Sequence, residues 1–190
     1  MKKILSILCL AATCAATGAT VQAPGNLLQN PSFADAGEPD AAAAGWKGWG
    51  GWLGREDARS PAHGGKCLIG YHHGEVTGDK DSGLWQDVTT VRTGQKLRFS
   101  VFVAADAPDA GHPAQEVELR LEATRHGREV TIASTITPVA DLQTAPGWHE
   151  LSVTGTTPEN NVRVLVVFTP AATERGGAVK VDDAKLEVVR

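Results

Sequence analysis

The residues best suited to contact a ligand are tryptophans, and three of the five in this chain lie close together. Trp46, Trp49 and Trp52 recur every third residue in a segment that otherwise contains only Gly and one Lys. The glycines disfavour a helix, so we expect a loop or extended segment that presents large rings. A glycine-rich segment lacks the neighbours to bury both Trp49 and Trp52. These two rings are therefore candidates to pack against a flat, partly apolar ligand.

Trp85 is a third candidate, and its orientation follows from its neighbours. It lies between Leu84 and Gln86 in a short strand-like run. Successive side chains of a strand point to opposite faces, so Trp85 points away from the face that Leu84 and Gln86 share. We expect its ring to contact ligand.

Charged side chains on the polar faces of two consecutive strands provide candidate hydrogen-bonding groups. Arg98 lies on one strand, and Glu118, Arg120 and Glu122 lie on the next. We expect Arg98 and Arg120 to bind hydroxyl groups; the alternative is a solvated face stabilised by cross-strand charge pairs. Hydrolysis of a glycosidic bond needs two carboxylates about 5–10 Å apart. Glu118 and Glu122 lie about 13 Å apart along one strand, which is too far, although a carboxylate from another strand leaves a hydrolase as an alternative.

The last predicted strand contains a break in its alternation. Val179 and Val181 place the buried face at odd positions, whereas Ala184 and Leu186 place it at even positions. The change of phase falls at Asp182–Asp183, where a β-bulge would absorb it. A bulge can aim one carboxylate inward, where a cation such as calcium would offset the cost of burial. The alternative is a solvated pair at a bend.

Alternating apolar and polar residues recur along the chain beyond residue 24, and a sustained helical period is absent. Turn signals rich in Gly, Pro and Asn separate the runs. We therefore predict an all-β fold, a two-sheet antiparallel β-sandwich without helices. The expected strands are 27–33, 67–71, 84–88, 96–103, 117–123, 130–137, 148–154, 163–168 and 178–189, and we expect a loop over 35–44.

The first 23 residues have the pattern of a secretory signal peptide. Lys2 and Lys3 precede an apolar run over 4–16, which is too short to span a bilayer. We expect residues 24–190 to form one domain that is secreted or periplasmic, with lipidation at Cys14 as an alternative. Cys67 would then be the single remaining cysteine, and its strand-like context indicates burial. The formal net charge of −4 argues against nucleic-acid binding, and nothing beyond the leader is long enough to span a membrane.

Several segments, in order along the chain, resemble the carbohydrate-binding modules of the family 4/9/22 type. These modules are jelly rolls of the galactose-binding-domain-like class. The segments that carry the resemblance are Asn26–Phe33 (NLLQNPSF), Gly45–Trp46, Gly64–Leu68 (GGKCL), Leu84–Val88 (LWQDV) followed by Gly94 and 97–103, Gly147–Trp148, and Val181–Leu186 (VDDAKL).

The resemblance implies roles for individual residues. Asp182 matches a structural calcium ligand, and backbone oxygens near the opening segment and the 64–66 turn would complete that site. The family often has Glu after the opening Phe, where this chain has Ala34. Trp46 matches a ring that packs into the core, and we also expect Trp148 to be buried.

The resemblance and the tryptophans together indicate a non-catalytic module that binds a glycan or polysaccharide, with calcium stabilising the fold. Sugar rings have flat C–H faces that match aromatic side chains. Fold alone does not fix function, so a calcium-stabilised envelope or adhesion protein without a glycan ligand stays an alternative. Association with the cell envelope or with a separate glycan-degrading enzyme would suit either interpretation.

Overall fold

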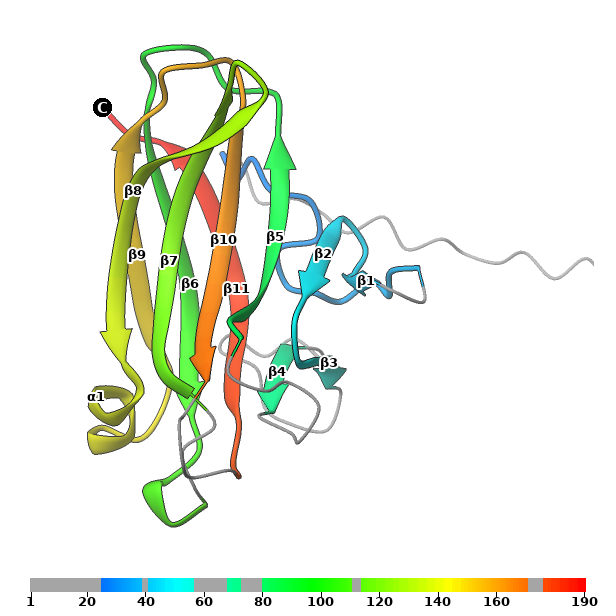
Figure 1. Cartoon of the computed structure of the whole chain (residues 1–190), viewed down its shortest axis with the longest axis vertical. Helices are drawn as coiled ribbons and strands as arrows, with labels where there is room; N and C mark the ends of the chain where they lie inside the picture. The colour runs from blue at the N-terminus through cyan, green and yellow to red at the C-terminus, as the bar shows by residue number, and fades with distance from the viewer. Residues whose placement is uncertain (1–24, 39–40, 57–67, 73–79, 111–113, 171–175) are drawn as a thin grey trace, which may run out of the picture.

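The computed structural model describes residues 25–38, 41–56, 68–72, 80–110, 114–170 and 176–190, and within them it is a two-layer β-sandwich (Figure 1). This confirms the predicted fold class. The strands are β1 (Ala41–Ala43), β2 (Trp46–Trp49), β3 (Trp52–Glu56), β4 (Leu68–His72), β5 (Ser82–Val88), β6 (Lys96–Ala105), β7 (Ala114–Arg125), β8 (Arg128–Pro138), β9 (His149–Thr156), β10 (Val162–Pro170) and β11 (Val179–Val188).

Two antiparallel sheets form the layers. Sheet A has six strands in the order β1-β2-β5-β10-β7-β8, and sheet B has five in the order β3-β4-β11-β6-β9. Strands that follow one another in sequence often lie in different sheets: β5 is in sheet A, β6 in sheet B and β7 again in sheet A. Side chains that alternate inward from both sheets form one core, which includes Leu84, Phe99, Leu119, Val166 and Leu186.

The opening segment is anchored without forming the regular strand expected over 27–33. Asn30 and Phe33 have positive φ values of 45° and 53°, which a strand does not accommodate. Asn26 fixes the segment to β11, because its side chain accepts from the Leu28 and Leu186 N–H groups. Phe33 and the Trp46 ring pack in the core with centroids 5.1 Å apart.

The predicted phase change in the last strand is a β-bulge. Asp182 pairs with Phe102 and Lys185 with Ser100, so two residues of β11 oppose one of β6. Asp183 takes a positive φ of 48° within this bulge. The bulge returns Ala184 to the core face and leaves Asp182 on the opposite face, where it is 1% exposed.

Two further expectations about secondary structure were wrong. The loop expected over 35–44 contains β1, which pairs with β2. A six-residue helix, α1 (Val139–Thr144), follows β8, because Val139 and Leu142 are three residues apart and bury on one side. Among the described residues, no helix is long and apolar enough to cross a membrane.

Candidate functional site

The outer face of sheet A brings together three of the five predicted ligand-contacting residues. Leu165 of β10 pairs with Trp85 of β5 on one side and with Arg120 of β7 on the other. At a strand spacing of about 4.8 Å, Trp85 and Arg120 lie about 10 Å apart across the sheet. A second set of paired residues crosses the same strands two positions along. Trp49 pairs with Gly83, Gly83 pairs with Val167, and Val167 pairs with Glu118. Trp49 and Trp85 thus lie on one side of Leu165 and Val167, and Glu118 and Arg120 lie on the other side.

Trp85 is half-buried and points outward, as its alternation with buried Leu84 and Gln86 predicted. Two cations lie against its ring: the Arg163 guanidinium carbon is 3.9 Å from the centroid and the Lys47 Nζ is 4.7 Å from it. Such contacts are attractive because the ring face carries negative charge density. They hold the ring in place and put hydrogen-bond donors beside it.

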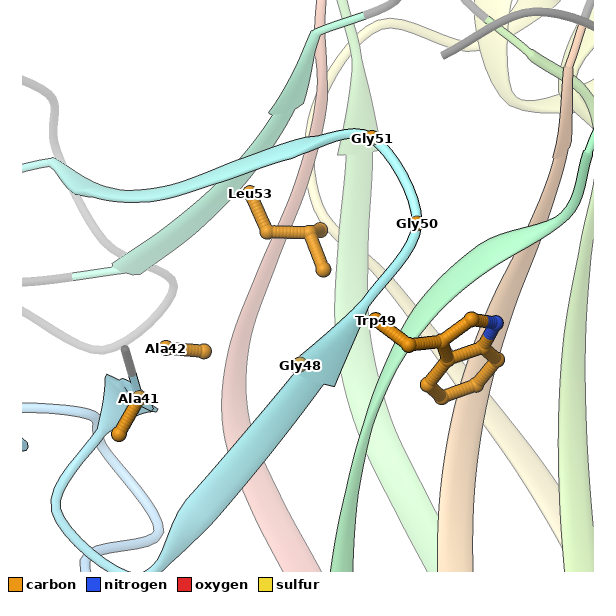
Figure 2. Close-up of a pocket in the computed structure, with 7 residues that line it drawn as sticks. All are labelled: Ala41, Ala42, Gly48, Trp49, Gly50, Gly51 and Leu53. Carbon is orange, nitrogen blue, oxygen red and sulfur yellow. The ribbon is translucent and has the colours of Figure 1, made fainter.

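Trp49 ends β2, and its ring lies on the backbone of β5. A Cβ added at Gly83 would collide with this ring and with the Val166 carbonyl, so only glycine permits the contact. Figure 2 shows the Trp49 side chain turned away from Ala41, Ala42 and Leu53, which line a hollow of about 230 Å³ together with Gly48, Gly50 and Gly51. The ring therefore belongs to the outer face of sheet A and does not fill that hollow.

Arg120 lies between two carboxylates of its own strand. Its Nε and Nη2 donate to Glu118 at 3.0 and 2.5 Å, and its Nη1 donates to Glu122 at 3.2 Å. The hydrogen bonds to Glu118 raise the pKa of the Arg120 guanidinium, and the charge of Glu122 adds to this. The side chains of Arg120, Glu118 and Glu122 are 29%, 16% and 11% exposed, respectively. Part of this polar cluster therefore faces solvent and can exchange hydrogen bonds with hydroxyl groups.

Arg98 does not join this site. The expectation placed it near Arg120 because the two lie on consecutive strands, but β6 belongs to sheet B. Arg98 lies on the outer face of that sheet, where it contacts Glu150 at 2.8 Å and Glu187 at 3.6 Å. These charge pairs match the alternative interpretation of a solvated, paired face.

The remaining tryptophans occupy different positions. Trp46 is 1% exposed, and its indole donates to the Asn30 carbonyl at 3.1 Å, which confirms that it is a core residue. Trp148 is half-buried and outside the core, so the expectation that it is buried was wrong; it follows an exposed turn and precedes β9. Trp52 begins β3 of sheet B, opposite His72, and its side chain lies outside the described structure.

Asp182 is the buried carboxylate of the β11 bulge, and its Oδ1 accepts from the Asp183 N–H at 2.8 Å. The opening segment lies beside it, because the Ala184 N–H donates to the Pro31 carbonyl. Within the described residues, no group of three or more His, Cys, Asp or Glu side chains gathers as a metal site. The 64–66 turn, Cys67 and residues 1–23, where a signal peptide is expected, all lie outside the described residues.

Sequence reasoning missed Lys47, Arg163 and Leu165 as parts of the site. Their parity along each strand places them outward, which the sequence does show. Their contact with Trp85 depends on the strand order β2-β5-β10, which brings together segments about 40 and 80 residues apart. That order is not encoded in local periodicity.

No protein-family model and no curated protein matches the sequence. Solved structures do share its fold. TmCBM61 in complex with beta-1,4-galactotriose is 17% identical, with a TM-score of 0.56, and covers 86% of this chain and 99% of its own. The CBM22-1 xylan-binding domain of Paenibacillus barcinonensis Xyn10C is 16% identical, with a TM-score of 0.53, and covers 84% of this chain and 92% of its own.

The structure of family 16 carbohydrate-binding module 2 is also similar. It is 16% identical, with a TM-score of 0.56, and the match covers 85% of this chain and 99% of that module. At these identities the likeness concerns the fold. The chain has the jelly-roll sandwich of carbohydrate-binding modules, and the resemblance that its sequence motifs indicated is confirmed at that level.

Proposed function

We propose that this chain is a non-catalytic carbohydrate-binding module that holds a glycan on the outer face of sheet A. The observation that carries the proposal is the placement of Trp49 and Trp85 beside the polar cluster of Glu118, Arg120 and Glu122 on one face. Aromatic rings can remove the apolar face of a sugar from water, while charged groups bind its hydroxyls. The solved modules with this fold, described as binding galactotriose or xylan, support the same class of ligand.

The ring contacts would supply most of the affinity. A hydroxyl hydrogen bond exchanges with water for a net gain of about 0.5–1.5 kcal/mol. A ring laid on a sugar removes apolar area at about 25 cal/mol per Å², without an equivalent exchange. The Lys47 and Arg163 contacts keep the Trp85 ring in one orientation, which lowers the entropy lost on binding. Trp52 stays a predicted contributor.

We further propose that calcium binds at the Asp182 bulge and that the chain is exported. A buried carboxylate suits a hard cation, and Asp182 lies opposite the core face, immediately before the extra residue of the bulge. Within the described residues no group of three or more His, Cys, Asp or Glu side chains gathers around Asp182, so backbone oxygens would have to complete the coordination. The charged start and apolar run of residues 1–23 support export.

Binding should be tested against a panel of insoluble and soluble polysaccharides, followed by calorimetric titration with oligosaccharides of any that binds. Binding of at least one glycan, with loss on Trp85→Ala and Trp49→Ala, supports the proposal. If the parent binds no glycan across the panel, the envelope or adhesion interpretation replaces it. If it binds and neither variant changes affinity, the ligand lies on another surface.

A further inference from the structure

One end of the sandwich carries a concentration of positive charge that the glycan-binding proposal does not use. The β7–β8 hairpin, the 92–96 segment and the 157–161 loop meet at this end, which is the top of Figure 1. Hydrogen bonds join them: Thr93 N–H donates to the Asn160 side chain at 2.9 Å, and Thr124 N–H donates to the Asn161 side chain at 2.7 Å. The loops therefore form one surface, called here the basic end.

The basic end carries four Lys or Arg residues against two carboxylates, Glu129 and Glu159, so it is net positive in a chain whose formal net charge is −4, and Glu129 lies 3.3 Å from Arg163. Its exposed positive residues are Arg92, Lys96, Arg125 and Arg128, with His126 at the tip of the hairpin. Glu159 approaches Arg125 at 3.7 Å, and the Arg125 side chain is still 59% exposed. Among the residues that the structure describes, Arg92, Lys96 and Arg128 make no ion pair.

The hairpin itself holds two like charges together. Arg125 pairs directly with Arg128 across the closing position of a two-residue turn. The turn residues His126 and Gly127 both have positive φ values, 51° and 73°, which is the tight type I′ geometry. Like charges directly opposite one another destabilise a strand pair, so this arrangement costs stability in the free protein. An anion placed between the two guanidinium groups would reverse that cost.

The basic end is broad and open rather than enclosed. Arg125, His126, Arg128 and Val130 line a wide, open hollow of about 590 Å³ at the hairpin. Val130 is 46% exposed there, so an apolar side chain stands beside the cations. The positive residues lie on the 92–96 segment and on the β7–β8 hairpin, which meet at this end, so a broad partner can contact both groups.

We propose that the basic end binds the phosphate groups of an anionic lipid bilayer. Guanidinium groups donate paired hydrogen bonds to phosphate, and clusters of four or more Lys and Arg favour anionic membrane surfaces. In this orientation the strands stand away from the bilayer, and the outer face of sheet A stays free to bind a second ligand. The proposal is independent of the glycan proposal.

Vesicle sedimentation tests this directly. The full chain is mixed with vesicles of phosphatidylcholine alone, or with about one third phosphatidylglycerol, at about 50 mM and about 500 mM salt. We expect binding to the anionic vesicles at low salt and its loss at high salt. The neutral vesicles measure any binding through the apolar run near the N-terminus.

The matched variants are Arg125→Gln/Arg128→Gln and Arg98→Gln/Lys185→Gln, each of which removes two positive charges. At about fivefold for each charge, the hairpin variant should bind about 25-fold more weakly. Its melting temperature should stay equal or rise, because the like-charge pair is gone; a merely structural role for the arginines would lower it. The proposal is overturned if anionic and neutral vesicles bind equally, if neither binds, or if the two double variants lose affinity equally. Binding of acidic polysaccharides but not of anionic vesicles would overturn it in favour of a glycan partner.

Discussion

The outer faces of the two sheets are both polar, but they are built differently. On sheet A, Trp85 and Trp49 lie beside Arg120 and its two carboxylates. On sheet B, Arg98 is held between Glu150 and Glu187, and Lys180 pairs with Asp106. The opening segment packs along β11 next to this second face. We interpret sheet A as the binding face and sheet B as the face that stabilises the fold.

This difference shows why an arginine on a polar strand face is a weak indicator of a site by itself. Arg98 and Arg120 have the same alternation pattern in the sequence. Of these two arginines, only Arg120 lies in line with a tryptophan across its sheet, because Leu165 pairs with both Arg120 and Trp85. Substitutions that change one face at a time separate loss of stability from loss of binding.

The largest effect concerns the sheet B face. Asp182→Asn should remove most of the stabilisation that calcium gives, about 2.7 kcal/mol at a hundredfold excess over Kd. Thermal melting with millimolar calcium or chelator measures it. Asp183→Asn is the matched control, because this neighbouring side chain is half-buried, and it should keep the calcium effect. The calcium proposal would be contradicted if neither calcium nor chelator changed the melting temperature of the parent protein.

On sheet A, Trp85→Ala should weaken glycan binding at least tenfold, which corresponds to about 1.4 kcal/mol. The variant loses the binding free energy that comes from apolar contact between the ring and the sugar. Titration calorimetry should therefore show a weaker affinity, while the far-UV spectrum stays unchanged. Trp148→Ala removes another half-buried tryptophan, which precedes β9 of sheet B, and should bind like the parent. Equal losses in both variants would mean that the ring effect is not specific to this face.

Replacing Arg120 should change glycan affinity less than replacing Trp85, and Arg98 provides the comparison. Arg120→Ala should lower glycan affinity about fivefold, the value of about 1 kcal/mol of lost hydrogen bonding. Arg98→Ala should leave affinity unchanged, because its partners are Glu150 and Glu187. Parallel titrations with one oligosaccharide decide this. The comparison fails if Arg98→Ala loses as much affinity as Arg120→Ala.

The smallest effect is a pH dependence on sheet B. The hydrogen bond from Arg98 holds the pKa of Glu150 below its ordinary value of 4.5. A lowered folded-state pKa contributes stability above that value and loses it as the pH falls through the folded-state pKa. Because the Glu150 side chain is 41% exposed, we expect less than about 1 kcal/mol. Denaturation at about pH 7 and pH 3 should show a smaller acid loss in Arg98→Gln than in the parent.

Local periodicity predicted the all-β sandwich, most of its strands and the bulge at Asp182, because alternation directly reports which side chains face a core. It also predicted the outward orientation of Trp85. It did not predict β1, which depends on pairing with β2, or the irregular opening segment, where Asn30 and Phe33 take positive φ.

The composition of the site was less accessible. Lys47 and Arg163 reach Trp85 only because β2, β5 and β10 are neighbours, and Arg98 is excluded only because β6 crosses to sheet B. Strand order depends on the packing of the whole sandwich, and no local pattern specifies it.

The central claim is that the glycan lies on the outer face of sheet A, and the indole N–H signals of the five tryptophans test it in one titration. Two-dimensional NMR of nitrogen-labelled protein, with signals assigned from single Trp→Phe variants, follows each ring as ligand is added. The account predicts that the Trp85 and Trp49 signals shift with a common Kd, while those of buried Trp46 and of Trp148 do not. The Trp52 signal decides whether that ring contributes. Saturable binding in which the Trp148 signal moves and the Trp85 and Trp49 signals stay in place would contradict the account.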